Sequence, residues 1–509
     1  MFMWVIYLLA TAIGLIALKE AVGVFKIFIL YKNQKGIKFY YKPLLGAFSV
    51  IYSKDKKDAF ANLRKLLRSM KDEEQLVVIN PTIGSRPFLI IKDPVLIKEF
   101  LSKDNEVAGR SMPFSLPIDP GFILKSGHKI LKDRAIFANF FKEENLVKIT
   151  PGIEQFVIKK VEEIKKDLFP SGRLNREFKK VELQQHFKPL FSDLVNYIMF
   201  GNKGCPLIDG KNLPQAVQEL TQDEVAHIEL HPLNLLLFRI PSKYKLLPKC
   251  KEQALKLNKI HEACQKMYKE RTSKRPEERG CNMIDLMIEH NLSCKEEEIL
   301  DQKSIIGNLI LFQLAGMDTS RQVSTSTLYY LSKHPEMADE LRKHIISDLF
   351  ENGWKSCIGD YGRFDDSKYL NKFMVEALRM FTSAGLALPR FAKKNFRLGK
   401  YRMFKGSVIV VPFTGPHYDP EIYPEPTKIK IDRFTKEKQR EVKNGSYLPF
   451  SSGNRDCLGR NLAQIFVRCL LCHFLRVFEL SEDKDFVGRM AFEFSYGMKK
   501  CSVKLRLRE

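Results

Sequence analysis

The chain has 509 residues, enough for one large catalytic unit or for several smaller domains. Lysine and arginine number 84 against 60 aspartate and glutamate residues, so the formal net charge is +24. No zinc-finger, RNA-binding or helix-turn-helix signature accompanies this charge, so we expect no nucleic-acid partner. Anionic lipid head groups and an acidic protein partner account for a basic chain instead.

The N-terminus has the composition of a membrane anchor. Its first 18 residues carry no charged side chain, and lysines dominate the next stretch, where Glu20 is the only acidic residue before Asp55. A helix of 18 residues reaches about 27 Å, which suits the thin bilayer of the endoplasmic reticulum. Positive charge after the span keeps the following domain in the cytosol. We therefore predict an anchor over residues 1–31 and a cytosolic catalytic domain over residues 32–509.

Two points about this anchor stay open. The second apolar run, Ala21–Tyr31, is interrupted by Lys26. It extends a tilted span or lies in the membrane interface, and the sequence does not decide between them. The alternative to an anchor is an N-terminal helix packed on the globular domain, which the apolar residues on all its sides argue against.

Helical patterns outnumber strand-like runs in the rest of the chain. Apolar periodicity predicts three long helices, over Lys251–Thr272, Ser304–Lys333 and Gln464–Glu479. Runs of apolar and β-branched residues predict three strands, at Gln75–Asn80, Pro87–Lys92 and Ser407–Pro412. Tyr401–Val411 is expected to form a hairpin that turns at Gly406. Because no linker-like segment or internal repeat interrupts the pattern, we predict one mainly α unit with small sheets.

The cysteines and histidines do not form a recognisable metal motif. Ten cysteines are scattered along the chain without the paired CxxC spacing of a zinc site, which favours a reducing, cytosol-facing location. Cys469 and Cys472 are expected to be core residues of a helix. His227 and His231 lie one helical turn apart, but the His-Glu-x-x-His order of zinc proteases and a third ligand are missing. We assign no metal site there.

Cys457 lies in an unusual segment, residues 450–459, which reads Phe-Ser-Ser-Gly-Asn-Arg-Asp-Cys-Leu-Gly. A helical pattern, Arg460–Leu475, follows at once. A thiolate at a helix start is stabilised by the helix dipole and by loop N–H groups, and such a thiolate can be an axial ligand of haem iron. Most isolated cysteines are buried structural residues instead. The spacing Phe-x-x-Gly-x-Arg-x-Cys-x-Gly argues against that interpretation here.

This ten-residue signature resembles that of the cytochrome P-450 family of haem-thiolate monooxygenases. Other segments extend the resemblance over most of the chain. Leu314–Ser320 resembles the oxygen-activating stretch of a long central helix, and Glu376-Ala-Leu-Arg379 resembles the Glu-x-x-Arg element. Ile431–Phe434 and His417–Pro420 resemble two later elements. The resemblance implies the cytochrome P-450 fold, a helical haem-binding domain with small β-sheets, behind the N-terminal membrane anchor of the microsomal members.

The resemblance also implies a set of contacts to haem b. These are Cys457 as the axial thiolate and metal ligand, Arg455, Phe450 and Gly453 from the same loop, Arg134 and Arg390 at the propionates, and the small residues Ala315 and Gly316 against the flat ring. Where the family usually has Trp-x-x-x-Arg, this chain has Ile130, which removes one donor to a propionate. Without the resemblance, Arg390 would be interpreted as an ordinary surface arginine after a turn.

Asp318 and Thr319 are the expected catalytic residues, because an acid beside a hydroxyl can deliver protons to dioxygen. Their alternative is a core helix in which Thr319 bonds back to a carbonyl four residues earlier and Asp318 faces solvent. Glu376, Arg379 and Arg433 are expected to form a buried cluster of three charges. Such a cluster is costly to bury and worse to break, so its expected role is structural.

The implied reaction inserts one atom of dioxygen into a small apolar substrate, with electrons from NADPH through a flavoprotein reductase. Candidate contacts outside the haem site are Lys129, Lys132 and Arg468 for the reductase, Leu233–Phe238 for membrane lipids, and Arg110–Pro117 with His231–Leu247 for the substrate. Two alternatives remain open. One is a haem-thiolate isomerase or dehydratase that acts on a peroxide, and the other is a haem sensor or carrier without turnover.

Overall fold

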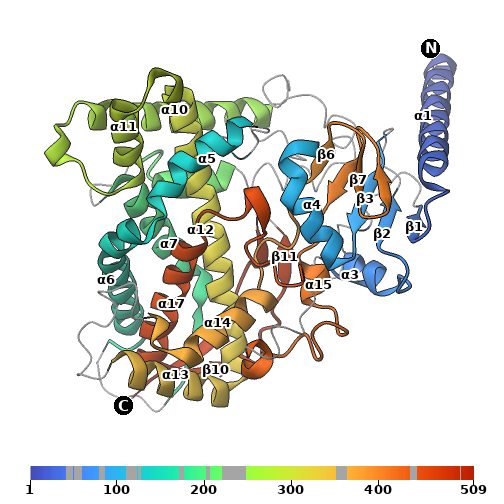
Figure 1. Cartoon of the computed structure of the whole chain (residues 1–509). Helices are drawn as coiled ribbons and strands as arrows, with labels where there is room; N and C mark the ends of the chain where they lie inside the picture. Colours follow the sequence, from blue (N-terminus) through green and yellow to red (C-terminus); the bar gives the residue numbers. More distant parts are fainter. Residues whose placement is uncertain are drawn as a thin grey trace.

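The computed structural model of the chain describes residues 2–41, 50, 60–79, 86–110, 123, 128–170, 177–201, 207–220, 248–350, 364–435, 444–492 and 495–508. A large block of helices lies beside a smaller region that holds a six-stranded sheet, and α1 projects from the far side of that sheet (Figure 1). The prediction of a mainly α protein with small sheets is confirmed.

The helices of the block share one hydrophobic core around α12. The helices with described bounds are α1 (Phe2–Tyr31), α3 (Ala61–Arg68), α4 (Pro94–Val107), α5 (His128–Phe140), α6 (Glu143–Leu168), α7 (Leu183–Phe200), α10 (Pro248–Thr272), α11 (Met283–Ser293), α12 (Gln302–Lys333), α13 (Pro335–Leu349), α14 (Lys368–Met380), α15 (Thr414–His417) and α17 (Arg460–Val477). Asp301 caps α12 by accepting a hydrogen bond from the Ser304 N–H at 2.6 Å. Cys469 and Cys472 are buried in α17, as predicted.

The three predicted long helices are present, but the last one ends early. α17 stops at Val477, and Phe478 begins strand β10 by pairing with Leu507. The apolar pattern continues through this point, so the pattern alone could not separate the helix from the strand. The pairing with a distant C-terminal strand decides where the helix ends.

The strands form one larger sheet and three small ones. Their bounds are β1 (Ile37–Tyr40), β2 (Leu76–Ile79), β3 (Phe88–Ile91), β4 (Ala108–Arg110), β5 (Lys179–Glu182), β6 (Arg390–Ala392), β7 (Phe396–Leu398), β8 (Tyr401–Met403), β9 (Val408–Val410), β10 (Phe478–Glu482), β11 (Met490–Phe492), β12 (Tyr496–Met498) and β13 (Ser502–Leu507). The six-stranded sheet has the order β1-β2-β3-β9-β6-β4. β10, β13 and β5 form a second sheet, and β11 with β12 and β7 with β8 form two hairpins.

The hairpin predicted for Tyr401–Val411 is wrong. β8 forms an antiparallel pair with the preceding strand, β7, through a turn in which Gly399 has φ +52°. β9 pairs with β3 and β6 instead. Gly406 does adopt a turn conformation, with φ +86°, but this turn sends the chain into a different sheet. The residue types at a turn therefore predicted its backbone but not the partners of the strands on either side.

α1 is one continuous helix of 30 residues. Its last turns are docked on the sheet, because Ile27 and Tyr31 belong to the hydrophobic cluster of β2, β3 and β9. Several large apolar side chains nearer its start are exposed, among them Trp4, Tyr7 and Phe25. In the part of the chain that the structure describes, no helix has both the length and the apolar character of a membrane span. The anchor over residues 1–31 therefore stays a prediction.

Some predictions from the sequence lie outside the described residues. They concern His227 and His231, Leu233–Phe238, the pocket segment His231–Leu247, and the part of Arg110–Pro117 after Arg110.

Candidate functional site

The Cys457 loop is a compact turn between a short 3-10 helix, Gly453–Arg455, and α17. The Cys457 N–H donates to the Phe450 carbonyl oxygen at 2.9 Å, which closes the loop. Gly453 has φ +77°, and a Cβ at this position would collide with the backbone of α4 at Leu101. The close approach that requires this glycine is therefore to a helix of the protein. A haem contact at Gly453 stays a prediction.

The Cys457 side chain is exposed at the start of α17. The pKa of the Cys457 thiol is raised, because protein atoms packed around it disfavour the charged form by more than a hydrogen bond from the Gly459 N–H favours it. Among the nearby charges, Asp456 also raises this pKa, and Arg460 and Arg134 lower it. Cys457 is therefore an exposed residue whose thiol has one N–H donor and two guanidinium groups nearby, groups that stabilise a thiolate ligand.

One stripe of the central helix α12 is only half-buried, and we call it the open stripe. Between Ile305 and Leu328 every residue of α12 is buried except Leu311, Phe312, Ala315, Gly316 and Thr319. These positions recur at intervals of three and four, so they lie on a single face. Two of the five are the small residues Ala315 and Gly316. A Cβ at Gly316 would lie 3.3 Å from the Val195 side chain of α7, so this glycine packs against a neighbouring helix and its contact with haem stays a prediction.

Aromatic side chains connect this stripe with the Cys457 loop. The Phe312 ring lies 5.3 Å from that of Phe137 and 6.1 Å from that of Phe141. A Cβ at Gly459, two residues after the cysteine, would lie 3.8 Å from Phe141. α12 and α17 also pack directly on each other. The exposed residue Cys457 and this stripe of α12 thus lie on neighbouring elements, and this donor set fits a haem group.

The three arginines assigned to the propionates each contact groups of the protein. Arg134 forms an ion pair with Asp456, next to the cysteine. Nε of Arg390 donates to Oδ2 of Asp104 at 2.7 Å, and Nη2 of Arg455 donates to Oδ1 of Asn105 at 2.9 Å. Their contact with propionates stays a prediction.

Arg390 is 2% exposed, so its interpretation as an ordinary surface arginine is wrong. Asp104 of α4 lies near both buried guanidinium groups, with its Oδ1 at 3.8 Å from Nε of Arg455. Nothing in the sequence around Asp104 signals this role, since its partners come from β6 and from the Cys457 loop.

Asp318 and Thr319 point to different partners. The Thr319 hydroxyl donates to the Ala315 carbonyl at 2.7 Å, the back-bond expected for an ordinary core threonine. Asp318 is 1% exposed, so it does not face solvent. Its carboxylate forms an ion pair with Arg321 and accepts hydrogen bonds from Gln218 and from the Ser495 N–H and hydroxyl. The two side chains are thus adjacent in sequence but are not hydrogen-bonded to each other.

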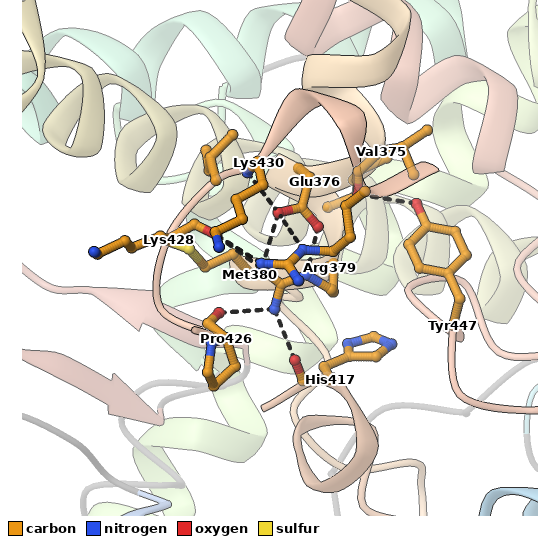
Figure 2. Close-up of polar contacts among 12 residues, drawn as sticks. Val375, Glu376, Arg379, Met380, His417, Pro426, Lys428, Lys430 and Tyr447 are labelled. Carbon is orange, nitrogen blue, oxygen red and sulfur yellow. Dashed lines mark hydrogen bonds and ion pairs between the residues drawn. The ribbon is translucent and has the colours of Figure 1, made fainter. Parts of the chain in front are cut away.

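Glu376, Arg379 and Arg433 come together in a closed cluster. Figure 2 shows Glu376 and Arg379 with their polar partners. Nε and Nη2 of Arg379 donate to the Glu376 carboxylate at 2.6 and 3.1 Å, and Nε of Arg433 donates to it at 3.1 Å. Arg379 also donates to the carbonyl oxygens of His417 and Pro426 at 2.7 and 2.8 Å. Glu376 and Arg379 are fully buried, so the cluster replaces the water that both charges lose.

His417 links this cluster to the cysteine side. Its Nε2 accepts from the Leu448 N–H at 2.9 Å, and its Nδ1 lies 3.1 Å from the Thr382 hydroxyl, which donates to Leu378. These partners require a neutral ring with the proton on Nδ1. Burial and the Arg379 charge accordingly lower the pKa of His417 to about 3. Leu448 precedes Phe450 by two residues, so the closed cluster supports the chain that enters the Cys457 loop.

The family model described as cytochrome P450 matches residues 61–505, which is most of the chain and includes all of these elements. The chain belongs to the cytochrome P450 family. Members of this family bind haem through a cysteine thiolate, and the enzyme is a P450 monooxygenase. Such enzymes use dioxygen, an organic substrate and a redox partner.

Several cytochromes P450 are similar to this chain over most of its length. Cytochrome P450 3A31 of Mesocricetus auratus is 26% identical over 429 residues, which cover 79% of this chain and 78% of the relative. Cytochrome P450 3A13 of Mus musculus is 25% identical over 419 residues with the same coverage. Cytochrome P450 3A5 of Homo sapiens is 26% identical over 419 residues, again with 79% and 78% covered.

Sequence reasoning missed several residues of this P450 site. Arg321 lies three residues after Asp318, a spacing at which helix side chains meet, so its ion pair was detectable. Ser495 and Gln218 come from distant segments and carried no signal. Arg468, a candidate reductase contact, lies against the Phe364 ring at 5.7 Å and donates to Gln464 at 3.3 Å. The side chains of Lys129 and Lys132 lie outside the described residues.

Proposed function

We propose that this P450 inserts one oxygen atom into a small apolar substrate and takes its electrons from NADPH through a flavoprotein reductase. The observation that carries the proposal is the exposed Cys457 sulfur beside the open stripe of α12. The stripe presents Leu311, Phe312 and Ala315, so it favours an apolar molecule over a charged one. Haem bound there would supply the oxygen-activating chemistry.

In this proposal Cys457 is the axial ligand. The N–H of Gly459 and the guanidinium groups of Arg460 and Arg134 stabilise its negative charge. Ala315 and Gly316 would border the ring on the α12 side, where Gly316 also packs against Val195 of α7. Arg134, Arg390 and Arg455 hold the two propionates, which requires that their present contacts with Asp456 and Asp104 be shared or exchanged.

We assign Thr319 and Asp318 to proton handling. Thr319 is the last residue of the open stripe, so its hydroxyl can turn from the Ala315 carbonyl toward a reacting oxygen and donate to it. Asp318, the preceding residue, would pass protons to Thr319. Arg321, Ser495 and Gln218 bind the Asp318 carboxylate. A proton relay needs an ionisable group and a hydroxyl at such adjacent positions. The isomerase and dehydratase alternatives need no such relay.

We place the enzyme at the endoplasmic reticulum membrane, held by residues 1–31 with the catalytic domain in the cytosol. Exposed apolar side chains on α1 support this attachment, among them Trp4, Leu15 and Leu18. The net charge of +24 suits both anionic lipids and an acidic reductase surface. Deletion of residues 1–22, which leaves the buried Ile27 and Tyr31 in place, should lower the amount of enzyme that stays on membranes after an alkaline carbonate wash, with haem incorporation unchanged.

The reaction is tested with purified holoenzyme, the reductase and an apolar substrate found by a ligand-binding difference-spectrum screen. We expect NADPH consumption that depends on the reductase and yields an oxygenated product. Conversion of an organic peroxide without NADPH or reductase, and no product with them, would favour the isomerase or dehydratase. Absence of turnover in both assays would favour a sensor or carrier.

A further inference from the structure

The junction between α1 and the six-stranded sheet is tightly held. Tyr31, the last residue of α1, is fully buried, and its hydroxyl lies 3.0 Å from the hydroxyl of Ser407. The Tyr31 ring meets Phe404 edge-on, with 5.1 Å between the ring centroids. Ile27, one turn earlier, is 4% exposed. The last turn of α1 is therefore packed as core and does not begin a free linker.

The next residues bind the same part of the sheet region. The Gln34 side chain donates to the Arg402 carbonyl oxygen at 3.1 Å and accepts from the Arg402 N–H at 2.6 Å, which imitates one step of strand pairing. The Tyr401 hydroxyl donates to the Gly36 carbonyl at 3.1 Å. Gly36 has φ +83°, and β1 starts directly after it. Side chains therefore fix the direction of the chain from Tyr31 to β1.

A group of exposed residues surrounds this junction. Phe28 of α1 and Phe39 of β1 have their rings 5.5 Å apart, and Phe39 and Tyr41 are 40% and 55% exposed. Lys32 and Lys35, between the two elements, are also exposed. Aromatic rings with lysines next to an apolar helix are typical of the boundary between lipid tails and head groups. β1 is also at the edge of the sheet, so none of the described strands covers this side.

We infer that Tyr31 and Gln34 form a latch that holds the catalytic domain at one tilt on the membrane, with Phe28, Phe39 and Tyr41 at the level of the lipid head groups. The inference rests on the proposed membrane attachment and adds to it. An anchor on a flexible linker leaves the domain free to turn. Here α1 is joined to the sheet region by the buried Tyr31 contact and the Gln34 hydrogen bonds. α1 leaves the sheet region in Figure 1, and its direction in the lipid therefore sets the direction of the domain.

The test uses full-length holoenzyme in oriented bilayers of phosphatidylcholine and phosphatidylserine. Linear dichroism of the haem absorption band reports the tilt of the domain. The latch variant combines Tyr31→Phe and Gln34→Ala, which remove the hydroxyl and the amide but keep the ring and the helix. The matched control combines Tyr7→Phe and Asn33→Ala, the same kinds of change at two exposed positions, one near the start of α1 and one next to Gln34.

We expect the latch variant to stay in the carbonate-washed membrane pellet and to keep its carbon monoxide spectrum, while its dichroism falls toward the isotropic value. The control should match the wild type in all three. Amide hydrogen exchange of residues 31–37, measured in detergent, should be about tenfold faster in the latch variant, the effect of losing one or two hydrogen bonds.

Two results would overturn the inference in different ways. Unchanged dichroism and unchanged exchange in the latch variant would show that Tyr31 and Gln34 do not set the tilt, although membrane attachment stands. Loss of the wild-type enzyme from the washed membranes would overturn the attachment itself, and with it the role of the latch.

Discussion

Two polar regions of this P450, on neighbouring parts of the fold, differ in how their charges are satisfied. In the cluster of Glu376, Arg379 and Arg433, the charges meet each other and backbone carbonyls. Figure 2 shows this for Glu376 and Arg379. Around Cys457 the sulfur is exposed and the α12 face beside it is open. A region whose groups all have partners inside the protein contributes stability, whereas a region with open groups is built for a ligand.

The largest effect expected at the open region is that of Cys457→Ser. The change should abolish the red-shifted carbon monoxide band of thiolate-ligated ferrous haem, because a neutral hydroxyl does not replace the thiolate. The fold should persist, since the side chain is exposed. Cys294→Ser is the control and should keep the band, because Cys294 is a half-buried free cysteine far from Cys457 in the sequence. A band that survives Cys457→Ser would remove Cys457 as the ligand.

The closed region should respond in stability. Arg379→Met leaves Glu376 buried with Arg433 as its remaining charged partner and removes the donors to His417 and Pro426. The free energy of unfolding should fall by about 3–5 kcal/mol, the cost of breaking a buried ion pair. Urea titration of the holoenzyme measures it. Arg275→Met, at an exposed arginine paired with glutamates, should change it by less than about 1 kcal/mol. Equal losses of stability in the two variants would contradict the stabilising role of the closed cluster.

Thr319→Ala sharpens the contrast, because it should change chemistry with little change in stability. Substrate binding and haem spectra should be normal, and NADPH oxidation should continue. Product formed per NADPH should fall by about 10²-fold as hydrogen peroxide rises, since a positioned donor is lost. Thr327→Ala removes the same kind of back-bond, Thr327 to Val323 at 2.7 Å, on a buried part of α12. This control should stay coupled, and a wild-type ratio in Thr319→Ala would remove Thr319 from the relay.

The smallest effect is a pH dependence of stability from His417. Its pKa is about 3 in the folded protein and about 6.5 in an unfolded chain, so only the unfolded chain takes up a proton between these values. The stability is complete above about pH 6.5 and decreases on acidification, by at most about 1.4 kcal/mol per pH unit.

Urea titrations of the wild type and of His417→Gln between about pH 7 and pH 5 measure this contribution. The variant should be less stable at neutral pH and should show a shallower loss on acidification. His344→Gln, at a half-buried histidine stacked on Tyr369, is the control and should keep the wild-type slope. The same slope in His417→Gln as in the wild type would assign the acid sensitivity to other groups.

Local sequence patterns predicted much of this molecule. The long α12 helix followed from its periodicity, and the start of α17 followed from the Cys457 segment. The Glu376 and Arg379 pair followed from their spacing on one helix. In each case the partners are close in sequence, so the signal needs no knowledge of the fold.

The sequence by itself determined the family signature around Cys457, the helical character of the chain and the positions that turn, such as Gly406. Only the tertiary structure decided the strand partners of β8 and β9, the end of α17, the contacts of Asp318 with Ser495 and Gln218, and the position of Asp104 between two arginines. The physical reason is that helix spacing and turn conformation are local properties of the backbone. Strand pairing and buried polar contacts depend on which of several possible partners, near or far in the sequence, the fold brings within hydrogen-bonding distance.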